Sequence, residues 1–218
     1  MGKHFRHPYL PLDPLKIQGM GFETFKEYLP EHAREQVSAL FTQEDLRVEV
    51  VPNRVTRHGD YRRLPEGGHV ITINKGENHY RFLLTLIHEL AHFRAFSNYG
   101  RGIKPHGIEW KNTFKALMLP FLRPEIFPES LLMPLANYLK NPKASSDADF
   151  ELTLALKSFD AANQKKYIFE IPEGSKFETQ SGRIFVRGSK RTKRFMCTEQ
   201  STGRVYLFQP HVRVKLLG

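Results

Sequence analysis

The sequence predicts an α+β protein: a helical domain with a small antiparallel sheet, followed by a small C-terminal β module. Apolar residues recur at helical spacing in several segments between residues 22 and 160, whereas residues 46–74 alternate as strands do. After residue 166, short strand-like runs are separated by turn residues. The 218 residues are 40% hydrophobic and 26% charged, which is typical of folded soluble domains.

The N-terminal part is predicted to be an extended arm followed by short helices and the sheet. Pro8, Pro11 and Pro14 predict an arm over residues 1–21 with little regular structure. The main domain, placed at residues 22–140, opens with helical segments at 23–29 and 31–43. Three strand-like runs then predict the antiparallel sheet: 46–51, 54–62 and 69–74.

The longest helical pattern spans residues 78–98 and has a broad apolar face. Gly100 and Gly102 shortly after it end the helix. Two more helices are predicted at 108–119 and 129–139. Residues 141–165 are expected to form a polar linker with one further helix at 150–160.

Residues 166–218 are predicted to form the compact β module. Its strand-like runs are 167–171, 183–187, 194–197 and 204–208. A module of this size buries little core. We expect the packing of seven apolar side chains to hold it together: Phe169, Ile171, Phe177, Phe185, Phe195, Tyr206 and Phe208.

Positive charge is concentrated at the C-terminal end. The chain has 33 Lys and Arg against 23 Asp and Glu, a net charge of +10, and residues 161–218 contribute +8 of it. This asymmetry favours association with phosphates, and DNA is the partner that we expect.

The composition also indicates a compartment. No apolar run approaches the ~18 residues that a membrane-spanning helix needs, and no secretory signal is recognised. Cys197 is the single cysteine, which excludes an intrachain disulfide. We therefore expect no membrane partner and a reducing, cytoplasmic location, associated with the nucleoid if the chain is bacterial.

The motif His88-Glu-Leu-Ala-His92 lies in the middle of the longest predicted helix. Residues four apart lie on one face of a helix, so both imidazoles can reach one metal ion. Glu89 can then act on a metal-bound water as general base without binding the metal itself. The surrounding residues are apolar and make an unliganded cluster costly, which favours metal binding over a structural role.

A third ligand is needed, because a catalytic zinc site has three protein ligands and an open position for water. His106 begins the run His106-Gly-Ile-Glu-Trp110, which follows a glycine-containing loop and can fold back onto the motif. Glu109 is the alternative third ligand. We favour His106 because it lies on the loop side of this run and a third imidazole is a normal zinc ligand, and we expect one catalytic Zn²⁺.

The motif helix, the loop 93–105 and the run 106–110 together resemble the SprT-like metalloprotease family, which includes bacterial SprT proteins and eukaryotic Spartan proteases. The resemblance covers residues 22–120. It implies a zincin-like core with His88, His92 and His106 as zinc ligands and Glu89 as the catalytic residue. By similarity to Spartan, it also implies a role in the repair of DNA–protein crosslinks.

The β module departs from the family pattern. SprT proteins often end in a zinc ribbon with two Cys-x-x-Cys pairs, and residues 192–203 are similar to its second knuckle. Cys197 stands at one thiolate position, but Gln200 replaces its partner, and Phe169 and Pro172 occupy the first pair's positions. One thiolate cannot hold a ribbon zinc. We therefore expect a ribbon-like module without zinc, in which Cys197 is a small buried side chain.

The densest basic run lies in an expected hairpin of this module. Its five cations are Arg187, Lys190, Arg191, Lys193 and Arg194. Phe195 and Tyr206 follow, so phosphate contacts with some base stacking are expected. The structural alternative is a solvated basic hairpin.

Two functions follow from these observations. The first is a zinc-dependent endopeptidase that acts on DNA-associated or DNA-crosslinked proteins, with Glu89 activating a water. The second is a nucleic-acid-associated or transcription-related factor with a structural or vestigial metal site. Glu89 favours the first, because a structural site needs no base next to its ligand.

Overall fold

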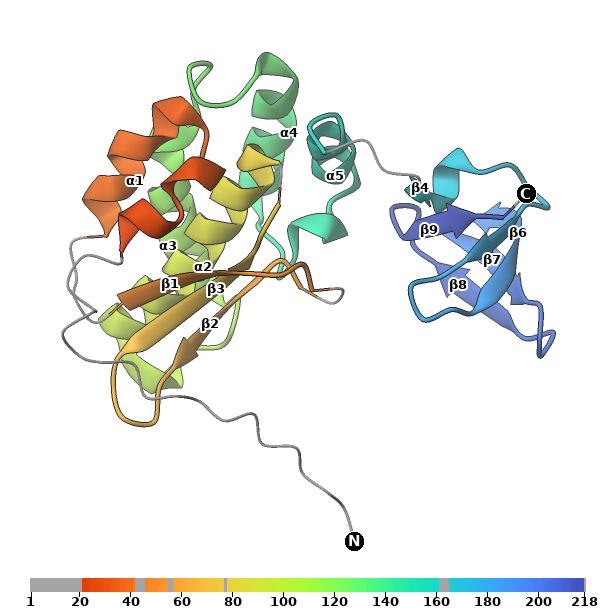
Figure 1. Cartoon of the computed structure of the whole chain (residues 1–218), viewed down its shortest axis with the longest axis horizontal. Helices are drawn as coiled ribbons and strands as arrows, with labels where there is room; N and C mark the ends of the chain where they lie inside the picture. The colour runs from red at the N-terminus through yellow and green to blue at the C-terminus, as the bar shows by residue number, and fades with distance from the viewer. Residues whose placement is uncertain (1–20, 42–45, 55–56, 77, 161–164, 218) are drawn as a thin grey trace, which may run out of the picture.

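The structure, a computed structural model, describes residues 21–41, 46–54, 57–76, 78–160 and 165–217 and is an α+β protein (Figure 1). The N-terminal domain, residues 21–160, contains a three-stranded sheet and the helices, whereas the C-terminal module, residues 165–217, contains a six-stranded sheet. The arm expected at residues 1–21 lies outside the described residues except for Gly21.

The sheet of the N-terminal domain consists of β1 (Leu46–Val51), β2 (Gly59–Arg63) and β3 (His69–Asn74) in the order β1-β3-β2. The prediction that it is antiparallel was wrong for one pair, because β1 runs parallel to β3. β3 is buried over four consecutive residues. A strand buried on both faces favours the central position, so β1 and the antiparallel β2 lie on either side of it.

Five α-helices are described, all in the N-terminal domain: α1 (Arg34–Leu40), α2 (His79–Tyr99), α3 (Ile108–Met118), α4 (Glu129–Lys140) and α5 (Phe150–Lys157). In place of the predicted helix at 23–29, the chain forms the 3-10 turns Phe22–Thr24 and Lys26–Tyr28. Phe25 between these turns is fully buried and leaves helical geometry, with φ −130°. Within the described part of the chain, every helix is too short or too polar to span a bilayer.

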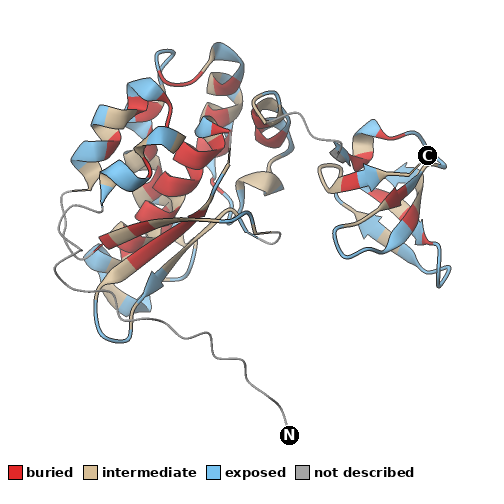
Figure 2. Ribbon diagram, in the orientation of Figure 1, coloured by how far each residue is buried: buried red, intermediate tan, exposed pale blue. Residues whose placement is uncertain are grey.

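The central helix α2 packs against β2, β3 and α3 (Figures 1 and 2). The Asn78 side chain caps its start by accepting a hydrogen bond from the Arg81 amide at 3.0 Å. Gly100 follows its last residue with φ 75°, a conformation that glycine adopts without strain. The helix is therefore a rigid, mostly buried element.

The C-terminal module has the strand order β4-β9-β5-β6-β7-β8, and every neighbouring pair is antiparallel. Its strands are β4 (Lys165–Tyr167), β5 (Lys176–Glu178), β6 (Ile184–Arg191), β7 (Arg194–Glu199), β8 (Val205–Phe208) and β9 (Arg213–Leu216). The strand predicted at 167–171 was wrong after Tyr167, where a 3-10 turn follows. The Glu170 carboxylate closes that turn by accepting a hydrogen bond from the Tyr167 amide at 2.7 Å.

The predicted core of the module is confirmed. Four of the seven expected side chains are buried and three are partly buried against them. Cys197 is free and fully buried within this core, as expected.

Candidate metal centre

Three histidines converge beside α2. The His106 Nε2 atom lies 3.2 Å from His88 Nε2 and 3.0 Å from His92 Nε2. With zinc–nitrogen bonds of about 2.0–2.1 Å, tetrahedral geometry separates ligand nitrogens by about 3.3 Å. The three side chains therefore lie close enough to bind one metal ion. Among the described residues, Glu109 is not in this group, so the geometry favours His106 as the third ligand.

A tight turn directs His106 toward α2. The Gly107 amide donates a hydrogen bond to the Lys104 carbonyl at 2.8 Å, with Pro105 and His106 at the centre of the turn. His106 has φ 57°, in the left-handed region that costs a non-glycine residue energy. A Cβ atom on Gly107 would lie 2.9 Å from the Lys104 carbonyl oxygen. The Pro-His-Gly sequence therefore suits this turn.

Trp110 packs against all three imidazoles. Its fully buried ring lies 4.6 Å from His88, 5.2 Å from His92 and 4.7 Å from His106 between ring centroids. Its Nε1 donates a hydrogen bond to the His88 carbonyl at 3.3 Å. Sequence reasoning missed this role, although Trp110 stands four residues after His106, in the first turn of α3.

The environment keeps the three imidazoles neutral. Burial, with the neighbouring histidines, lowers the pKa of His88 to about 3 and that of His92 to about 4. Burial and the charge of Lys111 also lower the pKa of His106. A neutral imidazole is the form that binds a metal, so the donor set is ready to bind at neutral pH.

Glu89 lies beneath β2 and is only 7% exposed. Burial raises its pKa to about 8, the nearby Asp60 adds to the shift, and a hydrogen bond from the Tyr61 amide opposes it. Gly59 permits this close approach, since a Cβ there would lie 2.7 Å from Thr85 Cγ2 and 3.1 Å from Glu89 Cγ. Sequence reasoning missed Gly59, although a glycine inside a strand pattern often marks such an approach.

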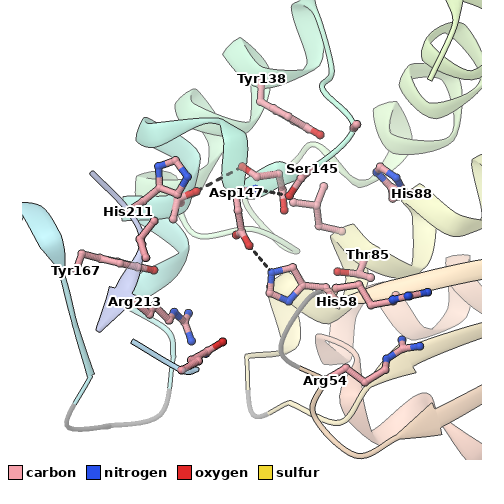
Figure 3. Close-up of a pocket in the computed structure, with 18 of the residues that line it drawn as sticks. Arg54, His58, Thr85, His88, Tyr138, Ser145, Asp147, Tyr167, His211 and Arg213 are labelled. Carbon is pink, nitrogen blue, oxygen red and sulfur yellow. Dashed lines mark hydrogen bonds and ion pairs between the residues drawn. The ribbon is translucent and has the colours of Figure 1, made fainter. Parts of the chain in front are cut away.

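A cavity of about 700 Å³ extends from His88, the one candidate ligand that lines it, toward the C-terminal module (Figure 3). His88 and Glu89 line one part, and His211 and Arg213 of the module line another. Asp147 also lines the cavity, where its carboxylate lies 2.6 Å from His58 Nε2. The site is therefore open to a ligand larger than water.

The five predicted nucleic-acid contacts do not share one environment. Lys190, Arg191, Lys193 and Arg194 are exposed near the turn that joins β6 to β7. Arg187 is different, because its guanidinium lies 4.3 Å from the Phe195 ring centroid and 3.5 Å from Glu173. Its side chain is only 14% exposed, so the four outer cations remain as the exposed group.

Comparison of the chain with models of known families, with curated proteins and with solved structures finds no match. The metal centre and the surfaces around it are therefore the observations from which a function can be inferred.

Proposed function

We propose that the protein is a zinc-dependent endopeptidase of the SprT-like type. The observation that supports this most directly is the convergence of three neutral imidazoles beside a buried glutamate at an open cavity. Three nitrogen donors with room for a further ligand suit catalytic zinc. Zinc bound there would polarise a scissile carbonyl and acidify a water.

The protein's own residues supply the proton transfers. Glu89 has a pKa raised to about 8, so near neutral pH it can both accept and release a proton. In the proposed reaction Glu89 takes a proton from the attacking water and delivers it to the leaving amine. The Tyr61 amide holds the carboxylate in place, and Trp110 packs against the ligand histidines and so orients them.

The exposed cations of the C-terminal module suit a DNA partner. Four cations lie within five residues, and no carboxylate of the described chain is ion-paired with them. Such a cluster binds phosphates mainly through electrostatic attraction. We propose that the module tethers the enzyme to DNA, that its substrates are DNA-associated or crosslinked proteins, and that it acts in the cytoplasm or at the nucleoid.

The decisive experiment compares the wild type with Glu89→Gln. We expect one zinc per chain in both proteins, and a loss of about 100-fold or more in cleavage of a DNA-binding protein by the variant. Single-stranded DNA should stimulate the wild type, because the module brings enzyme and substrate together. Undiminished cleavage by Glu89→Gln would overturn the proposed role of this residue.

The nucleic-acid-associated factor remains the second candidate, supported by the same exposed cations. It predicts salt-dependent DNA binding by a zinc-loaded sample that cleaves no protein, with or without DNA. That result would replace the protease proposal.

A further inference from the structure

β2 is an edge strand beside the candidate catalytic glutamate. It lies at one end of the order β1-β3-β2, and no strand among the described residues pairs with its outer side. An extended peptide can add to such an edge through backbone hydrogen bonds, here to groups other than the Tyr61 amide, which already donates to Glu89. The side chains of an added peptide alternate between the two faces of the sheet, so their neighbours on β2 and before it determine what is accepted.

Positive charge is in excess on β2 and on the residues just before it. Three arginines share the Asp60 carboxylate: Arg54 contacts it directly, Arg62 Nε lies 3.0 Å away and Arg57 Nη1 lies 3.7 Å away. Burial opposes ionisation of Asp60, but hydrogen bonds from Thr72 and Arg54 and the arginine charges lower its pKa below the usual value. One carboxylate therefore faces three guanidinium groups, which leaves a net charge of +2.

Arg57 is the member of this group that is available to a ligand. Arg54 donates further hydrogen bonds to Asn74 and to Thr72, at 2.8 and 2.9 Å. Arg57 is 55% exposed, lies beyond hydrogen-bond distance from Asp60 and lines the same cavity as Glu89. Asp147, the other acid that lines the cavity with Glu89, is already paired with His58 at 2.6 Å and with Arg81 at 3.0 Å.

We propose that this cleft selects acidic chain segments, and that Arg57 is the specificity-determining residue that pairs with a substrate carboxylate. The inference rests on the proposed endopeptidase function. A peptide is favoured over a nucleic acid as occupant, because only a peptide can continue the backbone hydrogen bonds of β2. Acidic segments of a DNA-bound protein are also repelled by DNA phosphates, which leaves them free to enter the cleft.

The test uses the zinc-loaded full chain and three peptides of equal length, with acidic, neutral or basic residues flanking one scissile bond. We expect the acidic peptide to have the highest kcat/KM, and Arg57→Ala to lower that value about tenfold without affecting the neutral peptide. Arg57→Lys should retain most of the preference, and Arg57→Glu should reverse it. Lys176→Ala is the matched control, because it removes an exposed cation outside the cavity lining.

Binding separates this inference from the proposed function. A fluorescent acidic peptide is titrated by anisotropy into Glu89→Gln, with and without Arg57→Glu, and circular dichroism confirms folding of both. Loss of peptide binding with Arg57→Glu supports the inference even if no peptide is cleaved. Absence of cleavage would overturn only the protease proposal. Equal cleavage of all three peptides, or equal binding by both variants, overturns the inference. A competition experiment with single-stranded DNA tests the remaining alternative. If the DNA binds more tightly than the peptide and displaces it from Glu89→Gln but not from the protein that also carries Arg57→Glu, Arg57 binds nucleic acid instead. That result would also overturn the inference.

Discussion

Two buried glutamates, one in each region of the protein, have pKa values that are shifted in opposite directions. Glu89 in the N-terminal domain is 7% exposed and Glu199 in the C-terminal module is 5% exposed. Arg183, with Nε 2.6 Å from the carboxylate, and Thr202 lower the pKa of Glu199 to about 2. Glu89 forms no ion pair in the described part of the chain, and burial raises its pKa to about 8 despite the opposing charges of Arg54 and Arg57. A buried acid with a cationic partner stabilises structure, and one without such a partner is poised for proton transfer.

The largest expected effects come from removing one aromatic ring from each region. Phe114 stacks on Trp110 at 5.1 Å between ring centroids, and Phe185 is the corresponding buried ring of the module. Phe114→Ala and Phe185→Ala should each cost about 3–5 kcal/mol of unfolding free energy, by calorimetry. Only Phe114→Ala should also lower the zinc content. Zinc loss in Phe185→Ala would show that the two regions fold as one unit.

A smaller effect is expected where β2 approaches Glu89. Gly59→Ala places a methyl group against Thr85 and Glu89, which displaces the carboxylate from the reacting water. Displacements of about 1 Å cost about 100-fold in rate, so kcat/KM should fall by that order while the zinc content stays unchanged. Gly102→Ala, at a position with open space around its Cα and no left-handed backbone conformation, is the control for effects on folding alone. Full activity in Gly59→Ala would contradict the packing of Glu89 under β2.

The pH dependence of stability should distinguish the two glutamates. Because the pKa of Glu89 is raised, its contribution to the free energy of unfolding is lost as pH rises from about 4.5 to about 8. The lowered pKa of Glu199 means that its contribution is present above about 4.5 and is lost as pH falls toward about 2. In metal-free protein, Glu89→Gln should therefore gain stability over the wild type at pH 9, and Glu199→Gln should lose it at pH 7.

Region-resolved hydrogen exchange at each pH would locate these changes. The gain of stability in Glu89→Gln should appear in α2, and the loss of stability in Glu199→Gln should appear in β7. The reverse assignment, or identical profiles for both variants, would contradict the difference between the two acids.

Sequence reasoning succeeded where the determinants are local. The spacing of His88 and His92 defines one helical face, and the Pro-His-Gly turn directs His106, so the donor set could be predicted. The pairing of β1 with β3 depends on contacts between distant segments, for which the sequence contains no local signal. The arginines around Asp60 lie within six residues of it in the sequence, and sequence reasoning missed them. The strand β5 was missed because three residues are too few for an alternating pattern, and β9 was missed although its four residues alternate.

The position of Trp110 has a practical consequence. It is the single tryptophan of the chain, and its indole lies within about 5 Å of three imidazoles. These imidazoles are neutral at neutral pH, so a metal ion bound by them would place a positive charge next to the indole, and a charge at this distance shifts indole emission. The intrinsic fluorescence of the protein should therefore act as a built-in optical gauge of metal occupancy, readable during titration without any added label.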